Sequence, residues 1–403
     1  MEIIRFLNPV APLGARRPPG HTPLPPVAIT DQVSDMLRRD AVVAVGVSGG
    51  KDSQAAAIAT AEYLKSIGHT GPKLLVHSDL GRVEWRQSLP VCERLAASLG
   101  WELFTVRRQA GDMMDRWNVR WDNNVARYRD LACVKLILPW STPSMRFCTS
   151  ELKVAVITSA LKKRYPDRDI VNVSGIRREE SAPRSKMPVS AAEPKLTRRG
   201  NVGHNWNPII EWKLGDVLTS IDAAGLKLHE AYTKYNMSRV SCAFCIMSSE
   251  GDLVASAGCA DNQAILHEMV GLEVRSTFAF QGHRWLADTA PSLLPDELKR
   301  MVEGAKRAAA QRQQIEAKIP DHLLYSKGWP THMPSAEEAR LLAMVRRDVA
   351  EIVGLSIGYT TGDEVRDRYA ELLHLKAQKL VGKADLEREE DEQEDVQMNM
   401  FAI

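Results

Sequence analysis

The stretch of sequence that most constrains this chain is VVAVGVSGGKDS, at residues 42–53. A run of small and β-branched apolar residues leads there into a glycine-rich turn, and residues 53–66 then have the pattern of a helix. Gly49 and Gly50 let the backbone approach a ligand closely, and the first-turn N–H groups of a helix attract anions. We therefore expect this turn to bind a phosphate group, with Lys51 adding a mobile positive charge.

Two features distinguish this turn from a Walker A motif. The residue five before Gly50 is Val45 rather than glycine, and Asp52 rather than Ser or Thr follows Lys51. SGGKDS instead resembles the SGGxDS loop of the PP-loop ATP pyrophosphatases, which split ATP between the α and β phosphates and use the AMP half to activate a substrate oxygen. The resemblance implies that the nucleotide contacts all six loop residues, Ser48, Gly49, Gly50, Lys51, Asp52 and Ser53. The alternative is a glycine turn that only links a strand to a helix.

A second predicted strand, at residues 73–77, ends in the polar segment SDLGRVE. Ligands of open α/β sheets bind at such carboxyl ends of strands. The segment resembles the DxGxE-type stretch of the sulfonucleotide-reductase branch of the PP-loop superfamily, although two residues rather than one separate Gly81 from Glu84. The resemblance implies that Asp79, Gly81 and Glu84 lie near the nucleotide or its Mg²⁺. The other interpretation is a polar loop with ordinary helix-start carboxylates.

A further predicted strand, at residues 170–174, ends in GIRREESAPR. This segment resembles the GIRxxES-x-x-R signature of the same branch, and the resemblance implies that Gly175, Arg177, Glu180 and Arg184 shape the nucleotide pocket. Independently of the resemblance, three arginines and a lysine within ten residues of a strand end form a plausible anion site. The segment NPIIEW at residues 207–212 resembles the one that closes the same domain.

The six cysteines divide into two groups. Cys92 and Cys133 lie among apolar residues and are expected in the core. Cys148 stands just before a predicted helix that Thr149 or Ser150 could cap, in a stretch that resembles the RxC-x-x-x-LK of the reductase-like branch. Residues 241–245 hold a CxxC pair, for which a redox pair, a zinc site and an iron–sulfur cluster are all open. The resemblance favours a [4Fe-4S] cluster on Cys148, Cys242 and Cys245, with Cys259 either as the fourth ligand or packed in the core.

The distribution of charge bears on possible partners. The net charge of +2 hides a tail, residues 384–403, with a net charge of −7, which leaves +9 on residues 1–383. Residues 116–129 interleave arginines with Trp117, Trp121 and Tyr128, as a surface that stacks nucleobases would, or as one apolar stripe of a helix would. Residues 186–205 are expected to form a mobile loop. These features suit DNA or RNA as a partner, and each has the alternative of a solvated surface.

Taken together, these segments predict an α/β fold with a doubly wound, mostly parallel sheet of the adenine nucleotide alpha hydrolase-like type. The predicted division is an extended Pro-rich arm (1–29), a nucleotide-binding domain (30–250), a helical domain (251–383) and an acidic, disordered tail (384–403). No run of about eighteen apolar residues is present, and the N-terminus lacks an apolar stretch of signal-peptide length. We therefore expect a cytoplasmic protein with no membrane partner.

Two departures from the sulfonucleotide reductases direct the functional hypothesis. Reductases of that branch have a degenerate phosphate loop and a nucleophilic cysteine in a C-terminal tail, whereas this chain has an intact SGGKDS and no cysteine after Cys259. The resemblance therefore implies an ATP pyrophosphatase that adenylates an oxygen for sulfur incorporation, with catalytic residues Lys51, Asp52, Asp79 and Arg177. The nearest members are the pyrophosphatases of DNA phosphorothioation systems (Dnd/Ssp type), which act with a cysteine desulfurase or other sulfur donor and further modification subunits. Alternatives are tRNA thiolation, sulfonucleotide reduction and a non-enzymatic nucleotide-binding role.

Overall fold

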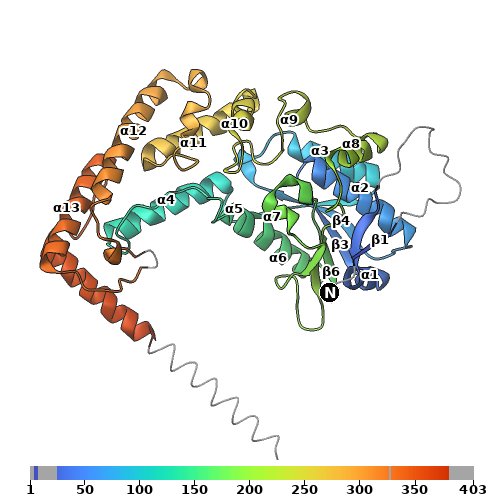
Figure 1. Ribbon diagram of the computed structural model, residues 1–403, viewed down its shortest axis with the longest axis horizontal. Helices are drawn as coiled ribbons and strands as arrows, with labels where there is room; N and C mark the ends of the chain where they lie inside the picture. Colours follow the sequence, from blue (N-terminus) through green and yellow to red (C-terminus); the bar gives the residue numbers. More distant parts are fainter. Residues whose placement is uncertain (1–3, 8–24, 326–327, 381–403) are drawn as a thin grey trace, which may run out of the picture. The chain divides into compact units, whose positions relative to one another are not determined.

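The computed structural model describes residues 4–7, 25–325 and 328–380, and these form two compact units (Figure 1). The first unit combines the residues up to Arg116 with Ser141–Met269 and Asp288–Leu293. The second combines Trp117–Trp140, Val270–Ala287 and the residues from Leu294 onward. The predicted acidic tail and residues 8–24 of the predicted arm lie outside the described residues. The sequence-based domain boundaries stay a prediction.

The first unit is built on a six-stranded sheet with the strand order β5-β4-β3-β6-β8-β7. All neighbours in it pair in parallel except β7 and β8, which pair antiparallel. A separate two-stranded ribbon joins β1 and β2. The strands are β1 (Ile4–Leu7), β2 (Val27–Thr30), β3 (Val42–Val47), β4 (Lys73–Asp79), β5 (Glu102–Arg107), β6 (Ile170–Val173), β7 (Ser190–Ala192) and β8 (Gly203–Trp206).

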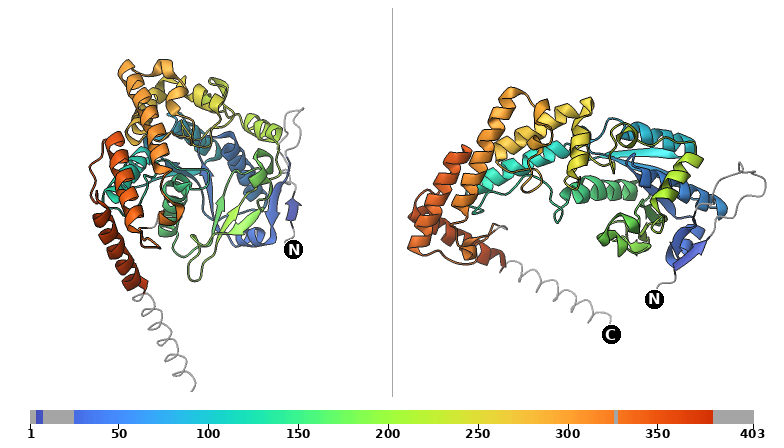
Figure 2. Two further views of the ribbon diagram at one scale, coloured as in Figure 1. Left: turned by 60° about the vertical axis from the view of Figure 1, so that its left-hand side comes forward. Right: turned by 45° about the horizontal axis from the view of Figure 1, so that its top comes forward.

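Helices lie on both faces of this sheet, which confirms the predicted fold class (Figures 1 and 2). Val43 and Val45 point to one face, where α1, α2, α3 and α8 cover them, while Val42 and Ala44 point to the other face, which α6 covers. This alternation follows from the two-residue period of a strand and explains why β3 is apolar throughout. The helices of this unit include α1 (Asp31–Arg38), α2 (Lys51–Ser66), α3 (Ser88–Leu99), α5 (Phe147–Thr149), α6 (Ala155–Arg164), α7 (Ala182–Ser185), α8 (Leu214–Ala223), α9 (Glu230–Thr233) and α10 (Glu250–Ala257).

The strand order places a topological switch point beside β3. From β3 the chain first adds β4 and β5 on one side, and it later returns to add β6 on the other side. The connections that leave the carboxyl ends of β3 and β6 therefore run in opposite directions, and ligands of such sheets bind at this point. The two motifs singled out in the sequence, SGGKDS after β3 and GIRREES after β6, begin at these two strand ends.

The prediction of a loop throughout residues 186–205 is wrong in part, and the predicted mobility stays a prediction. The segment contains β7 and the first residues of β8, and the pairs Ser190–Trp206 and Ala192–His204 place β7 at the edge of the sheet. The Trp206 side chain is fully buried, and its indole N–H donates to the Ala28 carbonyl at 2.7 Å. The strands are short and rich in polar residues, so periodicity could not reveal them. Their hydrogen bonds and one buried tryptophan fix them instead.

The second unit is helical, as predicted for the C-terminal region. Its helices are the later part of α4 (Met113–Arg129), the end of α11 (Gln263–Ser276), α12 (Asp296–Glu316), α13 (Ala336–Val353) and a helix over residues 362–380. Two buried arginines hold it together. Arg346 of α13 donates to the Tyr128 carbonyl at 2.8 Å, and Arg312 of α12 donates to the Thr277 carbonyl at 3.1 Å. Within the described residues, no helix of either unit is long and apolar enough to cross a membrane.

Candidate functional site

The glycine-rich turn links β3 to α2 as the sequence predicts. Gly49 has a φ of +76°, a conformation that favours glycine, and a Cβ there would lie 3.1 Å from the Ser88 Cα. The Ser53 hydroxyl donates to the Gly50 carbonyl at 2.9 Å and thereby closes the turn. Gly50 is the N-cap of α2, and no side chain among the described residues caps this helix. The first-turn N–H groups are therefore available to an anion, apart from the contact of Lys51 described below.

The structure joins this loop to the second motif through a buried ion pair. The Arg177 side chain, only 5% exposed, donates from Nε to Asp52 Oδ1 at 2.7 Å and from Nη1 to Glu179 Oε2 at 2.6 Å. Burial alone would lower the pKa of Arg177, but the hydrogen bond and charge of Asp52 raise it, so the guanidinium stays charged. Glu180 accepts from the Arg177 N–H at 3.0 Å and pairs with Arg184.

Gly175 shows how closely the two loops approach each other. A Cβ at this position would lie 2.4 Å from the Asp52 carbonyl oxygen and 2.8 Å from the Ser53 nitrogen. The backbone after β6 is thus packed directly against the first turn of α2. Only a residue without a side chain fits there. The structure therefore brings predicted residues of both motifs to one place at the switch point.

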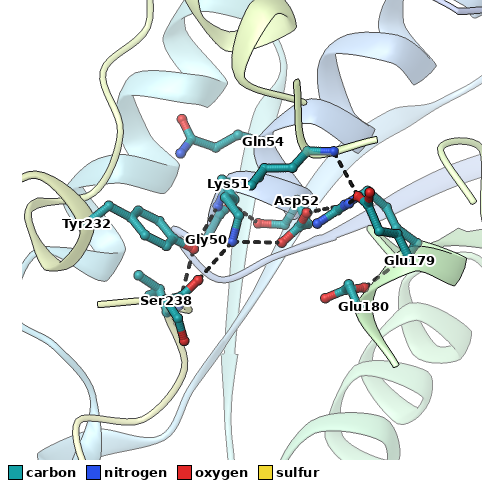
Figure 3. Close-up of polar contacts among 12 residues, drawn as sticks. Gly50, Lys51, Asp52, Gln54, Glu179, Glu180, Tyr232 and Ser238 are labelled. Atoms are coloured by element: carbon teal, nitrogen blue, oxygen red, sulfur yellow. Dashed lines mark hydrogen bonds and ion pairs between the residues drawn. The ribbon is translucent and has the colours of Figure 1, made fainter. Parts of the chain in front are cut away.

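Lys51 is buried rather than exposed to solvent, and Figure 3 shows its polar contacts. Its Nζ lies 3.2 Å from the Ser238 carbonyl oxygen, 3.6 Å from Asp52 Oδ2 and 4.7 Å from the centre of the Tyr232 ring. The Lys51 backbone N–H donates to the Tyr232 hydroxyl at 3.3 Å. Tyr232 and Ser238 belong to the segment around α9, and no motif in the sequence pointed to them.

The carboxylates after β4 have local partners. Asp79 Oδ1 accepts from the Gly81 N–H at 2.7 Å within the turn that leads to η1 (Gly81–Val83). Glu84 Oε2 lies 3.2 Å from Nε2 of the buried His77. Burial disfavours the charged imidazole, yet hydrogen bonds with Cys92 and Glu84 raise the pKa of His77 to about 10. Because β4 neighbours β3, both carboxylates lie toward the same end of the sheet as the phosphate loop.

Three of the four candidate ligand cysteines come together beyond Glu84. The CxxC segment runs along this turn, since the Ala243 N–H donates to the Val83 carbonyl at 2.7 Å and Cys242 pairs with Glu84 across a β-bridge. Burial raises the pKa of the Cys242 thiol to about 12, and the nearby charges of Cys245 and Cys148 act in the same direction. Cys259 instead makes a hydrogen bond with Tyr235. Within the described residues, no three side chains of His, Cys, Asp or Glu are arranged to hold a metal ion.

The helix around Cys148 differs from its prediction. Cys148 lies inside the short helix α5 rather than before a helix, and neither Thr149 nor Ser150 provides a side-chain cap. A π-helical turn, η2 (Ser150–Val154), follows and leads into α6. Its Leu152 carbonyl accepts from the Ser78 hydroxyl at 2.6 Å. Such turns are frequent at functional sites because they widen the backbone locally, and this one ties the Cys148 segment to the carboxyl end of β4.

The interpretation of residues 116–129 as a surface that stacks nucleobases is wrong. Trp117, Trp121 and Tyr128 are buried, and within the second unit the Trp117 ring packs edge-on against Trp140, with their centres 5.3 Å apart. The alternative of an apolar helix stripe is correct. Two arginines of the stretch bind backbone carbonyls, Arg120 that of Leu138 at 3.1 Å and Arg127 that of Ala132 at 3.3 Å. Aromatic residues four apart share one helix face, and here that face is core.

These features define an α/β nucleotide-binding domain with a phosphate loop at its switch point. The chain belongs to the phosphoadenosine phosphosulfate reductase domain family, whose profile matches residues 42–263, more than half of the sequence. That match covers the loop, the second motif and all four candidate ligand cysteines. No curated protein sequence matches the chain.

Two solved structures are similar to it at low identity. One is a phosphoadenylyl-sulfate reductase from Candida auris in a phosphate complex, 15% identical, which covers 50% of this chain and 80% of its own. The other is the U34-tRNA thiolase NcsA from Methanococcus maripaludis with its [4Fe-4S] cluster, 17% identical, which covers 68% of this chain and 75% of its own. Both have a TM-score of 0.31, too low for either similarity to indicate the substrate of this chain.

Proposed function

We propose that this chain is an ATP pyrophosphatase that adenylates an acceptor oxygen for its replacement by sulfur. The observation that carries the proposal is the intact phosphate loop together with a buried, charged arginine. Lys51 and Arg177 both lie at the first turn of α2, held by Asp52 between them. Two fixed cationic groups and an uncapped helix N-terminus form a site suited to a polyphosphate and to the charge that develops on it.

In the proposed reaction the acceptor oxygen attacks the α phosphorus of ATP, and the bond to the β-phosphate oxygen breaks. Pyrophosphate leaves with the electron pair of that bond, and Lys51 and Arg177 stabilise its negative charge. Asp52 positions both cations. Mg²⁺, when bound, neutralises the phosphates, and the Asp79 and Glu84 carboxylates lie toward this end of the sheet as its candidate ligands. A sulfur nucleophile then displaces AMP from the adenylated centre.

The sulfur step involves the thiols Cys148, Cys242 and Cys245. Cysteine sulfurs are the ligands that iron–sulfur clusters use, and the three that lie near one another beyond Glu84 fit this donor chemistry. Within the described residues, these three side chains are not arranged to hold a metal ion. We keep the [4Fe-4S] cluster, with zinc as the alternative, as part of the proposal. The hydrogen bond of Cys259 to Tyr235 favours the packing role for this cysteine.

A nucleic acid is the proposed acceptor, and DNA phosphorothioation of the Dnd/Ssp type is the specific case. A cysteine desulfurase or other donor would supply the sulfur, and further modification subunits would act with this chain. Support comes from the net charge of +9 on residues 1–383 and from exposed basic residues at the tip of the β7–β8 hairpin, Lys195, Arg198 and Arg199.

Affinity for DNA or RNA should fall steeply with salt, and Arg199→Ala should lower the slope of log affinity against log salt concentration by about 1. Arg38→Ala, an exposed arginine of α1, should leave it unchanged. Undetectable binding at low salt would indicate a small-molecule acceptor.

Sulfonucleotide reduction is the second candidate, because the family match itself favours it. In that case the protein would release sulfite from adenylyl sulfates with a thiol reductant and would not consume ATP. The intact loop argues against this role. Transfer-RNA thiolation would share the ATP chemistry and differ only in the acceptor.

Substitution of the loop lysine tests the proposed site. Lys51→Ala should lower the rate of pyrophosphate release by about 10²–10³-fold, since it removes one preorganised charge from the leaving group. Lys65→Ala, at the exposed last turn of the same helix, is the matched control and should keep the parent rate. Equal rates in both variants would contradict the assignment of the loop.

A further inference from the structure

Tyr232 occupies a place at the phosphate loop that its position in the sequence does not explain. Its hydroxyl accepts hydrogen bonds from the Lys51 N–H at 3.3 Å and from the Val240 N–H at 3.2 Å. The Lys51 N–H belongs to the first turn of α2, where a phosphate oxygen of the nucleotide would bind. The phenol oxygen therefore stands where an anion is expected (Figure 3).

The O–H donor of the Tyr232 phenol is unused among the described residues. A tyrosine hydroxyl has two acceptor lone pairs and one proton to donate. Here two backbone N–H groups use the acceptor side, and among the described residues the hydroxyl donates to none. Burial raises the pKa of Tyr232 to about 12, so the proton is retained at neutral pH. An anionic oxygen near α2 is the partner that this unused donor fits.

Contacts on both sides of Tyr232 hold it in place. The fully buried His229 accepts from the Ala231 N–H at 3.0 Å and caps α9. Ser238 donates from its backbone N and its hydroxyl to Asp252 of α10 at 2.8 and 2.7 Å. The same Ser238 accepts from Lys51 through its carbonyl. The tyrosine is thus presented to the loop by a pinned segment, which reduces the entropy that binding would cost.

We propose that Tyr232 is a phosphate-binding residue, which donates its O–H to a polyphosphate oxygen of the nucleotide at the N-terminus of α2. This inference rests on the proposed function. The Lys51 N–H bond to the phenol is long for its type, and a phosphate oxygen takes it over on binding. The Val240 N–H then keeps the tyrosine in place while its proton turns to the same phosphate. Specificity for a polyphosphate therefore depends on α9 as well as on the two motifs.

The test compares Tyr232→Phe with the parent protein in calorimetric titrations with pyrophosphate and with ATP. The variant keeps the ring over Lys51 and loses only the hydroxyl. Loss of a hydrogen bond to a charged group should weaken binding of both ligands by about 10- to 100-fold. Tyr63→Phe, which removes the hydroxyl of a buried tyrosine farther along α2, is the matched control and should bind as the parent does.

The outcomes separate this inference from the proposed function. Unchanged affinity in Tyr232→Phe would overturn the inference alone, and tighter binding would overturn it by showing that the phenol only competes with phosphate. Failure of the parent protein to bind either ligand would overturn the proposed function together with it. Thermal unfolding establishes that the variant is folded. If it is not, amide hydrogen exchange of residues 229–240 in the parent decides: pyrophosphate should slow exchange there, and faster exchange would overturn the inference.

Discussion

Gly175→Ala tests the close packing of the two motifs on which the site depends. The new Cβ would lie 2.4 Å from the Asp52 carbonyl oxygen and 2.8 Å from the Ser53 nitrogen. Both are backbone atoms, which cannot rotate out of the way as a side chain can. Normal contact requires the segments to separate by about 1 Å. Overpacking of this kind destabilises a fold by about 1–3 kcal/mol. A displacement of about 1 Å at a catalytic site can also cost about 10²-fold in rate.

Two assays measure these effects separately. Urea denaturation gives the free energy of unfolding, and pyrophosphate release from ATP gives the rate of the folded protein. Gly46→Ala is the matched control, since a Cβ at this position in β3 would meet only the Val173 carbonyl oxygen, at an ordinary 3.6 Å. Gly175→Ala should lose more than Gly46→Ala in both the free energy of unfolding and the rate. Losses no greater than those of Gly46→Ala would refute the close approach of the two loops.

Three further predictions concern the cysteines, a buried histidine and a tryptophan. Single Ala substitutions of Cys148, Cys242 or Cys245 should abolish the broad visible absorbance of anaerobically prepared protein, whereas Cys92→Ala and Cys133→Ala should retain it; a colourless parent protein with one zinc would contradict the cluster. Because the pKa of His77 is raised to about 10, its protonation stabilises the fold below about pH 6.5, and this contribution is lost as the pH rises toward 10. Glu84→Gln should therefore reduce the fall in unfolding free energy between pH 7 and 10. An unchanged fall would show that Glu84 does not raise the pKa of His77. Trp117→Ala should cost about 3–5 kcal/mol in unfolding free energy and leave the salt dependence of nucleic-acid binding unaltered. Unchanged stability together with weaker nucleic-acid binding would instead support a surface that stacks nucleobases.

The sequence was sufficient to predict where each of the two motifs lies in the fold, although not their contact. The apolar run of β3 and the glycine turn after it predict a central strand with a ligand at its end, and IVNVS followed by GIRREES predicts the same for β6. Since the carboxyl ends of parallel strands lie at one edge of a sheet, the pairing of Asp52 with Arg177 was within reach of this reasoning.

Other parts of the site could not be predicted in this way. Tyr232 lies 181 residues beyond Lys51, in a segment with only a four-residue helix, and nothing local to it indicates the loop. The β7–β8 hairpin is specified by pairing with β6 and by the burial of Trp206, both of which are tertiary effects. Trp117 and Trp121 were ambiguous, because the same spacing suits a core stripe and an exposed surface.

The products formed from ATP decide whether this chain is an ATP pyrophosphatase. The full chain, purified without oxygen, would be incubated with ATP and Mg²⁺ together with DNA or RNA, and the nucleotides separated by chromatography. We expect AMP and pyrophosphate in equal amounts, with both formed about 10²–10³-fold more slowly by Lys51→Ala. Formation of ADP and phosphate would contradict this expectation, and so would an absence of ATP cleavage accompanied by sulfite release from adenylyl sulfates.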